Sequence, residues 1–239
     1  ITDRTTAVWQ NGGFSAKFKF SSSIELLCKT EHLCFDFRHF AKLQTVGGNN
    51  NKTHMTNSIP DIELELADAL RKTLSDLKQD YPNDTFYYFA LTTVGEALSP
   101  GHSIWSEELL DSEAERQSIK YKRDLETIKR NIRYSYADSP LFYHYGQHFK
   151  KVEELYLNRR PNIDDLNDED WEKEFKLRIN SMINALKRVD EEKYFGIGKE
   201  RENWFLNVEV NPPDGSNQIR AENFNSKEKI QEWLDNGGE

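Results

Sequence analysis

The segment that decides the fold reads Tyr194-Phe195-Gly196-Ile197-Gly198-Lys199-Glu200-Arg201-Glu202, and a strand joins it to Asn211-Pro212-Pro213-Asp214. The strand, residues 203–210, alternates strictly: Trp204, Leu206, Val208 and Val210 share one face, and Asn203, Asn207 and Glu209 share the other. Gly196 is expected to end the preceding helix in a left-handed conformation. The two prolines fix two φ angles and remove two donors, which ends the strand. The segment therefore predicts a helix end, a charged surface turn, an edge-compatible strand and a rigid loop.

The helix before this segment is the most periodic part of the chain. It is predicted over residues 168–190, because its apolar residues recur every three or four positions and so share one face. These residues are Trp171, Phe175, Ile179, Met182, Leu186 and Val189. A second long helix is predicted to start at Pro60-Asp61 and to end before Pro82. A last helix is expected over residues 227–234.

The strands are predicted from their aromatic and β-branched content. Residues 85–94 lack polar alternation, which is typical of a central strand buried on both faces. A second strand is expected over residues 102–105, helix over 107–133, and a short helix over 147–158. The predicted fold class is therefore α/β (α+β), with a mostly antiparallel or mixed central sheet flanked by helices.

The first 60 residues differ from the rest of the chain. They hold seven Lys and Arg against four Asp and Glu, a net of +3, whereas residues 61–239 hold 25 against 37, a net of −12. Residues 17–20 and 34–37 alternate like strands, and residues 47–51 are rich in Gly and Asn, as in a loop. We therefore predict two parts: a β-rich N-terminal extension or extra sheet layer, residues 1–60, and an α/β domain, residues 61–239.

Charge and composition narrow the classes of function. The net charge of −9 argues against nucleic acid as a partner, and no apolar run approaches the roughly 20 residues needed to cross a membrane. Cys28 and Cys34 are expected to be reduced, as in a cytoplasmic protein. His144 and His148 stand four apart, but no third ligand accompanies them, so neither a metal nor a cofactor is predicted.

An acidic run precedes and begins the long helix. It comprises Asp164, Asp165, Asp168, Glu169, Asp170, Glu172 and Glu174. Acidic residues are favoured at a helix N-terminus, because they complement the helix dipole there. The alternative is a negative surface that docks a basic partner. The first five residues are the candidate partner-binding site.

A second candidate site is a ligand pocket. It would gather Trp105, Tyr136, Arg201, Glu202 and Asp214, since a planar guanidinium suits the recognition of carboxylates. Gly196 and Gly198 lack the third glycine of a dinucleotide loop and follow a helix rather than a strand. The sequence contains no Gly-x-Ser-x-Gly elbow and no zinc-protease histidine pair. No catalytic constellation is therefore identified.

Four groups of residues carry a family resemblance. The first runs from Ala185-Leu186, through Phe195-Gly196 and Lys199-Glu200-Arg201-Glu202, to Val208-Glu209-Val210-Asn211-Pro212-Pro213-Asp214. The second is Thr85-Phe86-Tyr87-Tyr88-Phe89-Ala90-Leu91, and the third is Tyr136-Ala137-Asp138-Ser139-Pro140. The fourth is Phe224-Asn225-Ser226. Over residues 61–239 the chain resembles the bacterial family called domain of unknown function 4303. The resemblance implies an intracellular bacterial α/β domain without an established activity, cofactor or catalytic residue.

The leading functional hypothesis is a non-enzymatic, immunity-type protein that neutralises a basic partner toxin. It rests on the acidic run, on the net charge of −12 over residues 61–239 and on the lack of a catalytic constellation. It also rests on the analogy of small acidic families that accompany toxins. One alternative is an enzyme or small-ligand domain that uses the pocket near Trp105, Tyr136, Arg201 and Asp214. Another is a subunit of a larger assembly, in which residues 14–40 pair with a second chain.

Overall fold

The computed structural model describes residues 5–11, 14–20, 58–160, 162–213 and 215–238. The chain divides into two compact units, residues 1–53 and residues 54–239. In the first unit β1 (Thr5–Asn11) pairs antiparallel with β2 (Phe14–Phe20), which contains the strand predicted at 17–20. The features predicted at 34–37 and 47–51 lie outside the described residues, as do Cys28 and Cys34. The assignment of residues 1–60 and 61–239 to separate domains stays a prediction.

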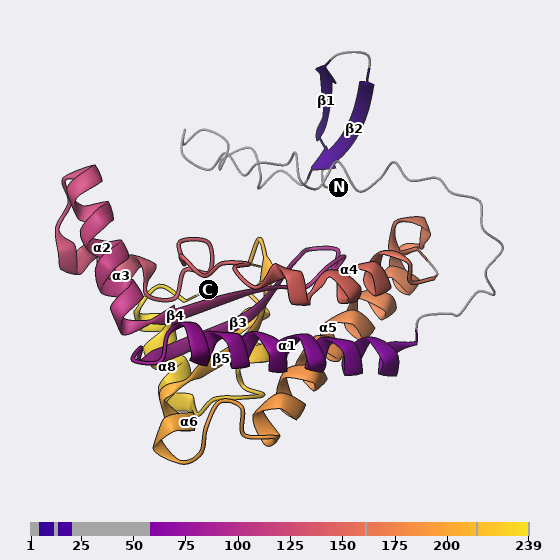
Figure 1. Cartoon of the computed structure of the whole chain (residues 1–239). Helices are drawn as coiled ribbons and strands as arrows, with labels where there is room; N and C mark the ends of the chain where they lie inside the picture. The colour runs from indigo at the N-terminus through magenta and orange to yellow at the C-terminus, as the bar shows by residue number, and fades with distance from the viewer. Residues whose placement is uncertain (1–4, 12–13, 21–57, 161, 214, 239) are drawn as a thin grey trace. The chain divides into compact units, whose positions relative to one another are not determined.

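A mixed three-stranded sheet forms the centre of the second unit (Figure 1). Its strands are β3 (Phe86–Val94), β4 (Gly101–Ser106) and β5 (Phe205–Asn211), in the order β4-β3-β5. β4 runs antiparallel to β3, and β5 runs parallel to it. The sequence-based predictions of a mixed sheet and of a central strand at residues 85–94 are confirmed.

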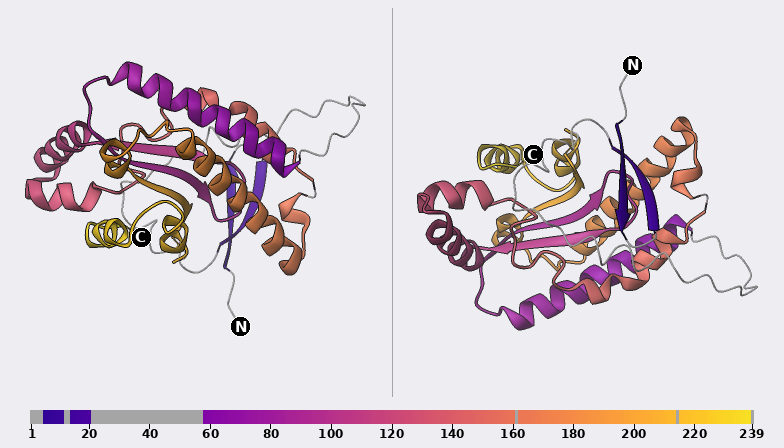
Figure 2. Two further views of the ribbon diagram at one scale, coloured as in Figure 1. Left: turned by 90° about the horizontal axis from the view of Figure 1, so that it is seen from below. Right: turned by 90° about the horizontal axis from the view of Figure 1, so that it is seen from above.

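Helices cover both faces of the sheet (Figure 2). α1 (Ile59–Asp80), α4 (Lys150–Leu157) and α5 (Asp168–Glu191) pack on one face, around a core that includes Leu70, Phe89 and Leu186. α2 (Glu107–Tyr121), α3 (Leu125–Ile132) and α8 (Lys227–Asp235) contribute to a second core on the other face, which includes Trp105, Phe205 and Trp233. Among the described residues, no helix is both long enough and apolar enough to span a membrane.

The two long helices begin at the capping residues that their sequences supply. The Ser58 hydroxyl accepts the N–H of Asp61 at 3.3 Å, and Pro60 occupies the first turn of α1, where no N–H is needed. The Asn167 side chain accepts the N–H groups of Glu169 and Asp170 at the start of α5. Both predicted helix starts are therefore confirmed to within one residue.

The C-terminal end of α5 differs from the prediction. The left-handed residue that closes the helix is Lys193, with φ of 70°, rather than Gly196. The N–H of Lys193 donates to the Asp190 carbonyl and that of Tyr194 to the Val189 carbonyl, which is the Schellman pattern of a helix end. Gly196, with φ of 90°, lies in the turn that follows.

The charged segment after this turn is helical, not a simple surface turn. Residues 199–203 form α6 (Lys199–Asn203), so Asn203 belongs to a helix and β5 begins two residues later. A short helix that the sequence analysis missed, α7 (Asn217–Ala221), follows β5. Both elements are single turns, too short to leave a periodic apolar pattern.

Side chains close the free edge of β5. The N–H of Leu206 donates to Asn225 Oδ1 at 3.0 Å, and the Leu206 carbonyl accepts a hydrogen bond from Asn225 Nδ2 at 2.7 Å. The N–H of Val208 donates to Asn207 Oδ1, and its carbonyl accepts Arg220 Nε at 2.7 Å. The backbone groups of Val210 bond in the same way to the Asn217 amide, at 2.8 and 3.4 Å. These amide and guanidinium groups take the place of a neighbouring strand.

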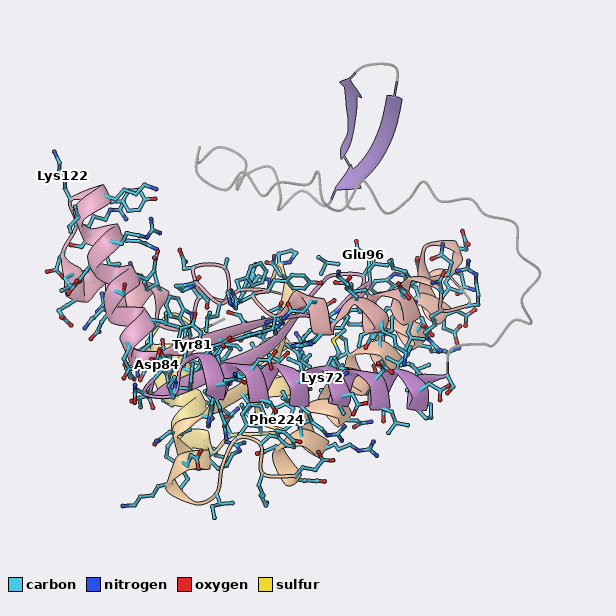
Figure 3. All side chains as sticks on the ribbon, in the orientation of Figure 1. Lys72, Tyr81, Asp84, Glu96, Lys122 and Phe224 are labelled. Atoms are coloured by element: carbon cyan, nitrogen blue, oxygen red, sulfur yellow. The ribbon has the colours of Figure 1, made fainter. Side chains whose placement is uncertain are left out.

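The opposite edge, on β4, is covered by the segment that follows α3. The His102 carbonyl accepts the N–H of Tyr143 at 2.9 Å, and the Ile104 carbonyl accepts the Ser139 hydroxyl at 2.5 Å. α2 and α3, which follow the end of β4, form an arm, and Lys122 stands at its far end (Figure 3). The sheet is therefore bounded on both sides by its own chain.

Candidate functional site

Exposed carboxylates surround the start of α5. Asp165 ends a short 3-10 turn, η4 (Ile163–Asp165), and Asp168, Glu169 and Asp170 form the first turn of the helix. All four side chains are exposed, and we call them the acidic face. A hydrogen bond from Asn167 and then the proximity of Lys173 hold the pKa of Asp170 below its usual value. The side chain of Asp164 lies outside the described residues.

An aromatic pair adjoins the acidic face. Trp171 and Phe175, one helical turn apart on α5, stack with ring centroids 5.2 Å apart and an interplanar angle of 7°. Both rings are partly exposed, and Phe175 also contacts the core. Aromatic side chains at the centre of a charged rim are a common arrangement at protein–protein interfaces. The start of α5 thus combines an apolar anchor with negative charge.

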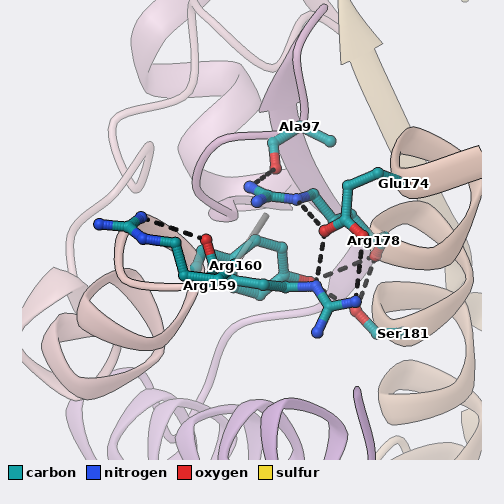
Figure 4. A network of polar contacts seen from close by, with 7 residues as sticks. Ala97, Arg159, Arg160, Glu174, Arg178 and Ser181 are labelled. Atoms are coloured by element: carbon teal, nitrogen blue, oxygen red, sulfur yellow. Dashed lines mark hydrogen bonds and ion pairs between the residues drawn. The ribbon is translucent and has the colours of Figure 1, made fainter. Parts of the chain in front are cut away.

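Glu174 does not share the environment of the other acidic residues. Its side chain is 5% exposed and accepts hydrogen bonds from two arginines (Figure 4). Arg159 binds both carboxylate oxygens, at 2.5 and 3.0 Å, and Arg178 Nε binds one of them at 2.9 Å. The acidic run therefore divides into exposed residues at the helix start and one interior carboxylate. Sequence reasoning missed this, although Glu174 stands three residues after Trp171 and four residues before the buried Arg178, on the same side of the helix.

Arg178 connects this buried cluster to the turn after β3. Its Nη1 donates to the carbonyl of Ala97, which has a φ of 49°. The backbone carbonyl of Arg178 accepts the Ser181 hydroxyl at 2.7 Å and the Tyr156 hydroxyl at 3.2 Å. The cluster thus joins α4, α5 and the β3–β4 turn, which indicates a structural role.

The ligand-pocket candidates are distributed over different parts of the fold. Trp105 is fully buried and donates from Nε1 to the Ser135 carbonyl at 2.9 Å. Tyr136 follows Ser135 and lies on the same side of the sheet, where its carbonyl accepts the Ser103 hydroxyl. The backbone around Tyr136 therefore lies beside the strand that carries Trp105.

Arg201 is engaged elsewhere. Its guanidinium pairs with Asp190 at 2.5 Å and donates to the carbonyls of Trp204 and Phe224. Glu202 is exposed on α6, and Asp214 lies outside the described residues. These contacts hold the end of α5 against β5, and the existence of a ligand pocket stays a prediction.

Two polar residues of β5 are buried. The sequence pattern placed them on the second face of the strand and did not predict their burial. Asn207 and Glu209 are 0% and 6% exposed, and Glu209 lies opposite Thr92 of β3. Burial, and then the nearby Glu209 carboxylate, raise the pKa of Tyr88 well above its usual value. The alternation was predicted correctly, but helices on both faces of the sheet enclose the polar residues as well as the apolar ones.

A buried histidine lies at the edge of the sheet. His102 is fully buried and stacks on Phe149, with ring centroids 4.8 Å apart. Its Nε2 accepts the N–H of Tyr145 at 3.2 Å, which places the proton of the neutral ring on Nδ1. Burial, and then the positive charge that His144 and His148 can carry, lower the pKa of His102 from 6.5 to about 3. The ring is therefore neutral throughout the physiological range.

This histidine should make the protein less stable in mild acid. Unfolded His102 binds a proton below pH 6.5 and the folded ring does not, so unfolding becomes more favourable as the pH falls from 6.5 towards 3. At pH 5 the expected cost is about 2 kcal/mol of unfolding free energy. Urea unfolding of the parent and of His102→Phe at pH 8 and pH 5 measures it. An equal pH dependence in both proteins would contradict this assignment.

His144 and His148 are the other two histidines that the structure describes. His148 Nε2 lies 2.7 Å from Asp76 Oδ2, and His144 is exposed in the preceding turn. In the part of the chain that the structure describes, no three His, Cys, Asp or Glu side chains are placed to hold a metal ion.

An open groove lies between α2, α3 and α8. It has a volume of about 570 Å³, and its charged lining residues include Glu107, Asp111, Lys129, Arg130, Arg133 and Glu232. Arg133 binds Glu107 through two hydrogen bonds, and Lys129 pairs with Asp111 at 2.5 Å. Most of its cations are thus paired within the groove, and none of the predicted pocket residues lines it.

Comparison with known proteins yields one similarity. A protein-family model described as a domain of unknown function (DUF4303) matches residues 66–226 of this chain. No curated protein and no solved structure matches it. The matched region contains the sheet, α5 with the acidic face, and the residues that close the edge of β5.

Proposed function

The chain belongs to the DUF4303 family of domains of unknown function, and we propose that it is a protein-binding, immunity-type protein of the bacterial cytoplasm. In this proposal the acidic face and the Trp171–Phe175 pair dock a basic toxin and cover its active surface. The observation that carries the proposal is the exposure of Asp165, Asp168, Glu169 and Asp170 beside this stacked aromatic pair. Negative charge would speed the encounter with a basic partner, and the aromatic rings would supply buried contact area.

The architecture of the sheet supports recognition through side chains. A partner that adds a strand needs free backbone groups along a sheet edge. On β5 those groups already bond to Asn207, Asn217, Arg220 and Asn225. A partner of this unit is therefore expected to bind to helices and side chains rather than to the edge of β5.

Neutralising the acidic face tests the proposal. The variant carries Asp168→Asn, Glu169→Gln and Asp170→Asn, and its partner is the product of the neighbouring gene. We expect about a tenfold loss of affinity at low salt, because three favourable charge contacts weaken. The loss should shrink as added salt screens the parent's charges. Titration calorimetry at low and high salt measures both effects.

The matched control neutralises three exposed carboxylates elsewhere: Glu96→Gln, Glu202→Gln and Glu222→Gln. The control variant has the same net charge as the acidic-face variant, so comparing the two separates the effect of the acidic face from the effect of the overall charge. A Trp171→Ala variant should lose affinity at every salt concentration, because its effect is apolar. If the neighbouring gene product binds the acidic-face variant as tightly as it binds the parent under all conditions, the proposal is wrong.

A further inference from the structure

The arm formed by α2 and α3 has little support along its outer half. The buried residues of α2 are Leu110, Glu113 and Ala114, all in its first half, and none of residues 115–121 is buried. Lys122 then ends the helix in a left-handed conformation, with φ of 53°. Figure 1 shows the arm projecting past the ends of the strands, and Figure 3 shows Lys122 at its far end.

The end of the arm is basic and partly apolar. We call residues 119–123 the arm tip: Ile119, Lys120, Tyr121, Lys122 and Arg123. Ile119 is 80% exposed, and Lys120 lies over the Tyr121 ring at 4.9 Å. Within the described ranges, none of the three cations forms an ion pair with a carboxylate. The neighbouring Asp124 instead caps α3 by accepting the N–H of Thr127.

The arm tip and the acidic face have complementary surfaces. One presents three cations around an exposed isoleucine, and the other presents four carboxylates beside a partly exposed aromatic pair. They lie at opposite ends of the same unit in every view (Figures 1 and 2). One molecule therefore cannot bring them together, whereas two copies can.

We propose that the arm tip of one copy docks on the acidic face of a second copy. The contact is head-to-tail, so each copy keeps one free arm tip and one free acidic face, and association can continue into short chains. A tip of five residues is small beside the roughly 20–30 residues per side of a standard interface, so the association is weak and reversible. The inference rests on the proposed function and adds a competitor at its site, because a basic partner must displace the arm tip.

Charge reversal on each side separates this contact from other forms of association. The tip variant carries Lys120→Glu, Lys122→Glu and Arg123→Glu, and the face variant carries Asp168→Lys, Glu169→Lys and Asp170→Lys. Sedimentation velocity of the full chain should show a weight-average mass that rises with concentration at low salt and returns to the monomer at high salt. Each variant alone should stay monomeric, because its two surfaces then carry charge of the same sign.

An equimolar mixture of the two variants should associate again. The acidic tip of one variant meets the basic face of the other, and the remaining basic tip meets the remaining acidic face. A control variant with Lys72→Glu, Lys193→Glu and Lys199→Glu, all exposed in the parent, has the same net charge as the tip variant but keeps the arm tip and the acidic face. This control should therefore still associate on its own at low salt. Circular dichroism shows whether each variant is folded.

The result that overturns the inference is a parent that stays monomeric at low salt, or a mixture of variants that does not associate. Its failure is distinguishable from failure of the proposed function. If the face variant loses the neighbouring gene product but the mixture does not associate, the proposed function stands and self-association falls. If the mixture associates and the gene product binds neither the parent nor the variant, self-association stands and the proposed function falls.

Discussion

Replacing Glu174 by alanine is expected to lower the free energy of unfolding by about 3–5 kcal/mol, because it leaves a buried arginine without its counter-charge. Arg178 is 2% exposed and cannot reach solvent, while Arg159, at 12%, has little more freedom. The loss should appear in urea unfolding followed by circular dichroism.

A triple variant distinguishes loss of charge balance from loss of packing. Glu174→Leu with Arg159→Met and Arg178→Met keeps similar volume and removes all three charges of the cluster. Replacing a buried ion pair by apolar residues is often neutral or stabilising, so this variant should recover most of the stability. If Glu174→Ala costs less than about 1 kcal/mol, the carboxylate does not balance the arginines in the way its contacts indicate.

Replacing Asn225 by leucine is expected to destabilise the protein by about 2–4 kcal/mol. The substitution removes the partners of both backbone groups of Leu206, a residue with no exposed surface. It also removes a hydrogen bond to the Ala221 carbonyl. Each buried backbone group left without a partner costs about 1–3 kcal/mol. Urea unfolding measures the total, and faster amide exchange at Leu206 locates the effect.

Asn223 provides the matched control for this prediction. It lies two residues earlier and is exposed, and its side chain bonds to Lys187 and to the Arg220 carbonyl. Asn223→Leu changes the same atoms without uncovering a strand edge, so it should cost less than about 1 kcal/mol. Equal losses in the two variants would show that closure of the β5 edge contributes little.

The sequence was most informative where a repeated pattern spans several turns or a whole strand. The spacing of apolar residues in α5 and the dense apolar run of β3 predicted both elements correctly, because burial of one face or of both requires those patterns. α6 and α7 are single turns held by tertiary contacts such as those of Arg201 and Asn217. Such contacts leave no local pattern, which explains why both helices were missed.

The candidate site was predictable only in part, since a charge in a sequence does not reveal its environment. Asp168 and Glu174 appear in one acidic run, yet the first is exposed and the second lies between two arginines. The helical phase of residue 174 relative to 171 and 178 contains that information, but only once the buried side of α5 is known. Arg201 was predicted to line a ligand pocket, which stays a prediction, and its partners in the structure are backbone carbonyls and Asp190.

Closure of the β5 edge has a consequence for the order in which a nascent chain can fold. β3 and β4 are neighbours in sequence, but β5 begins at Phe205 and its edge is closed by residues up to Asn225. During synthesis 98 residues, 107–204, separate the β3–β4 hairpin from the first residue of β5, and one side of β3 stays unpaired until β5 arrives. Exposed strand edges in such a state invite misassembly. The long separation also makes pairing of β3 with β5 a late, high-contact-order step. Productive folding of this unit thus depends on the residues translated last in the matched family region.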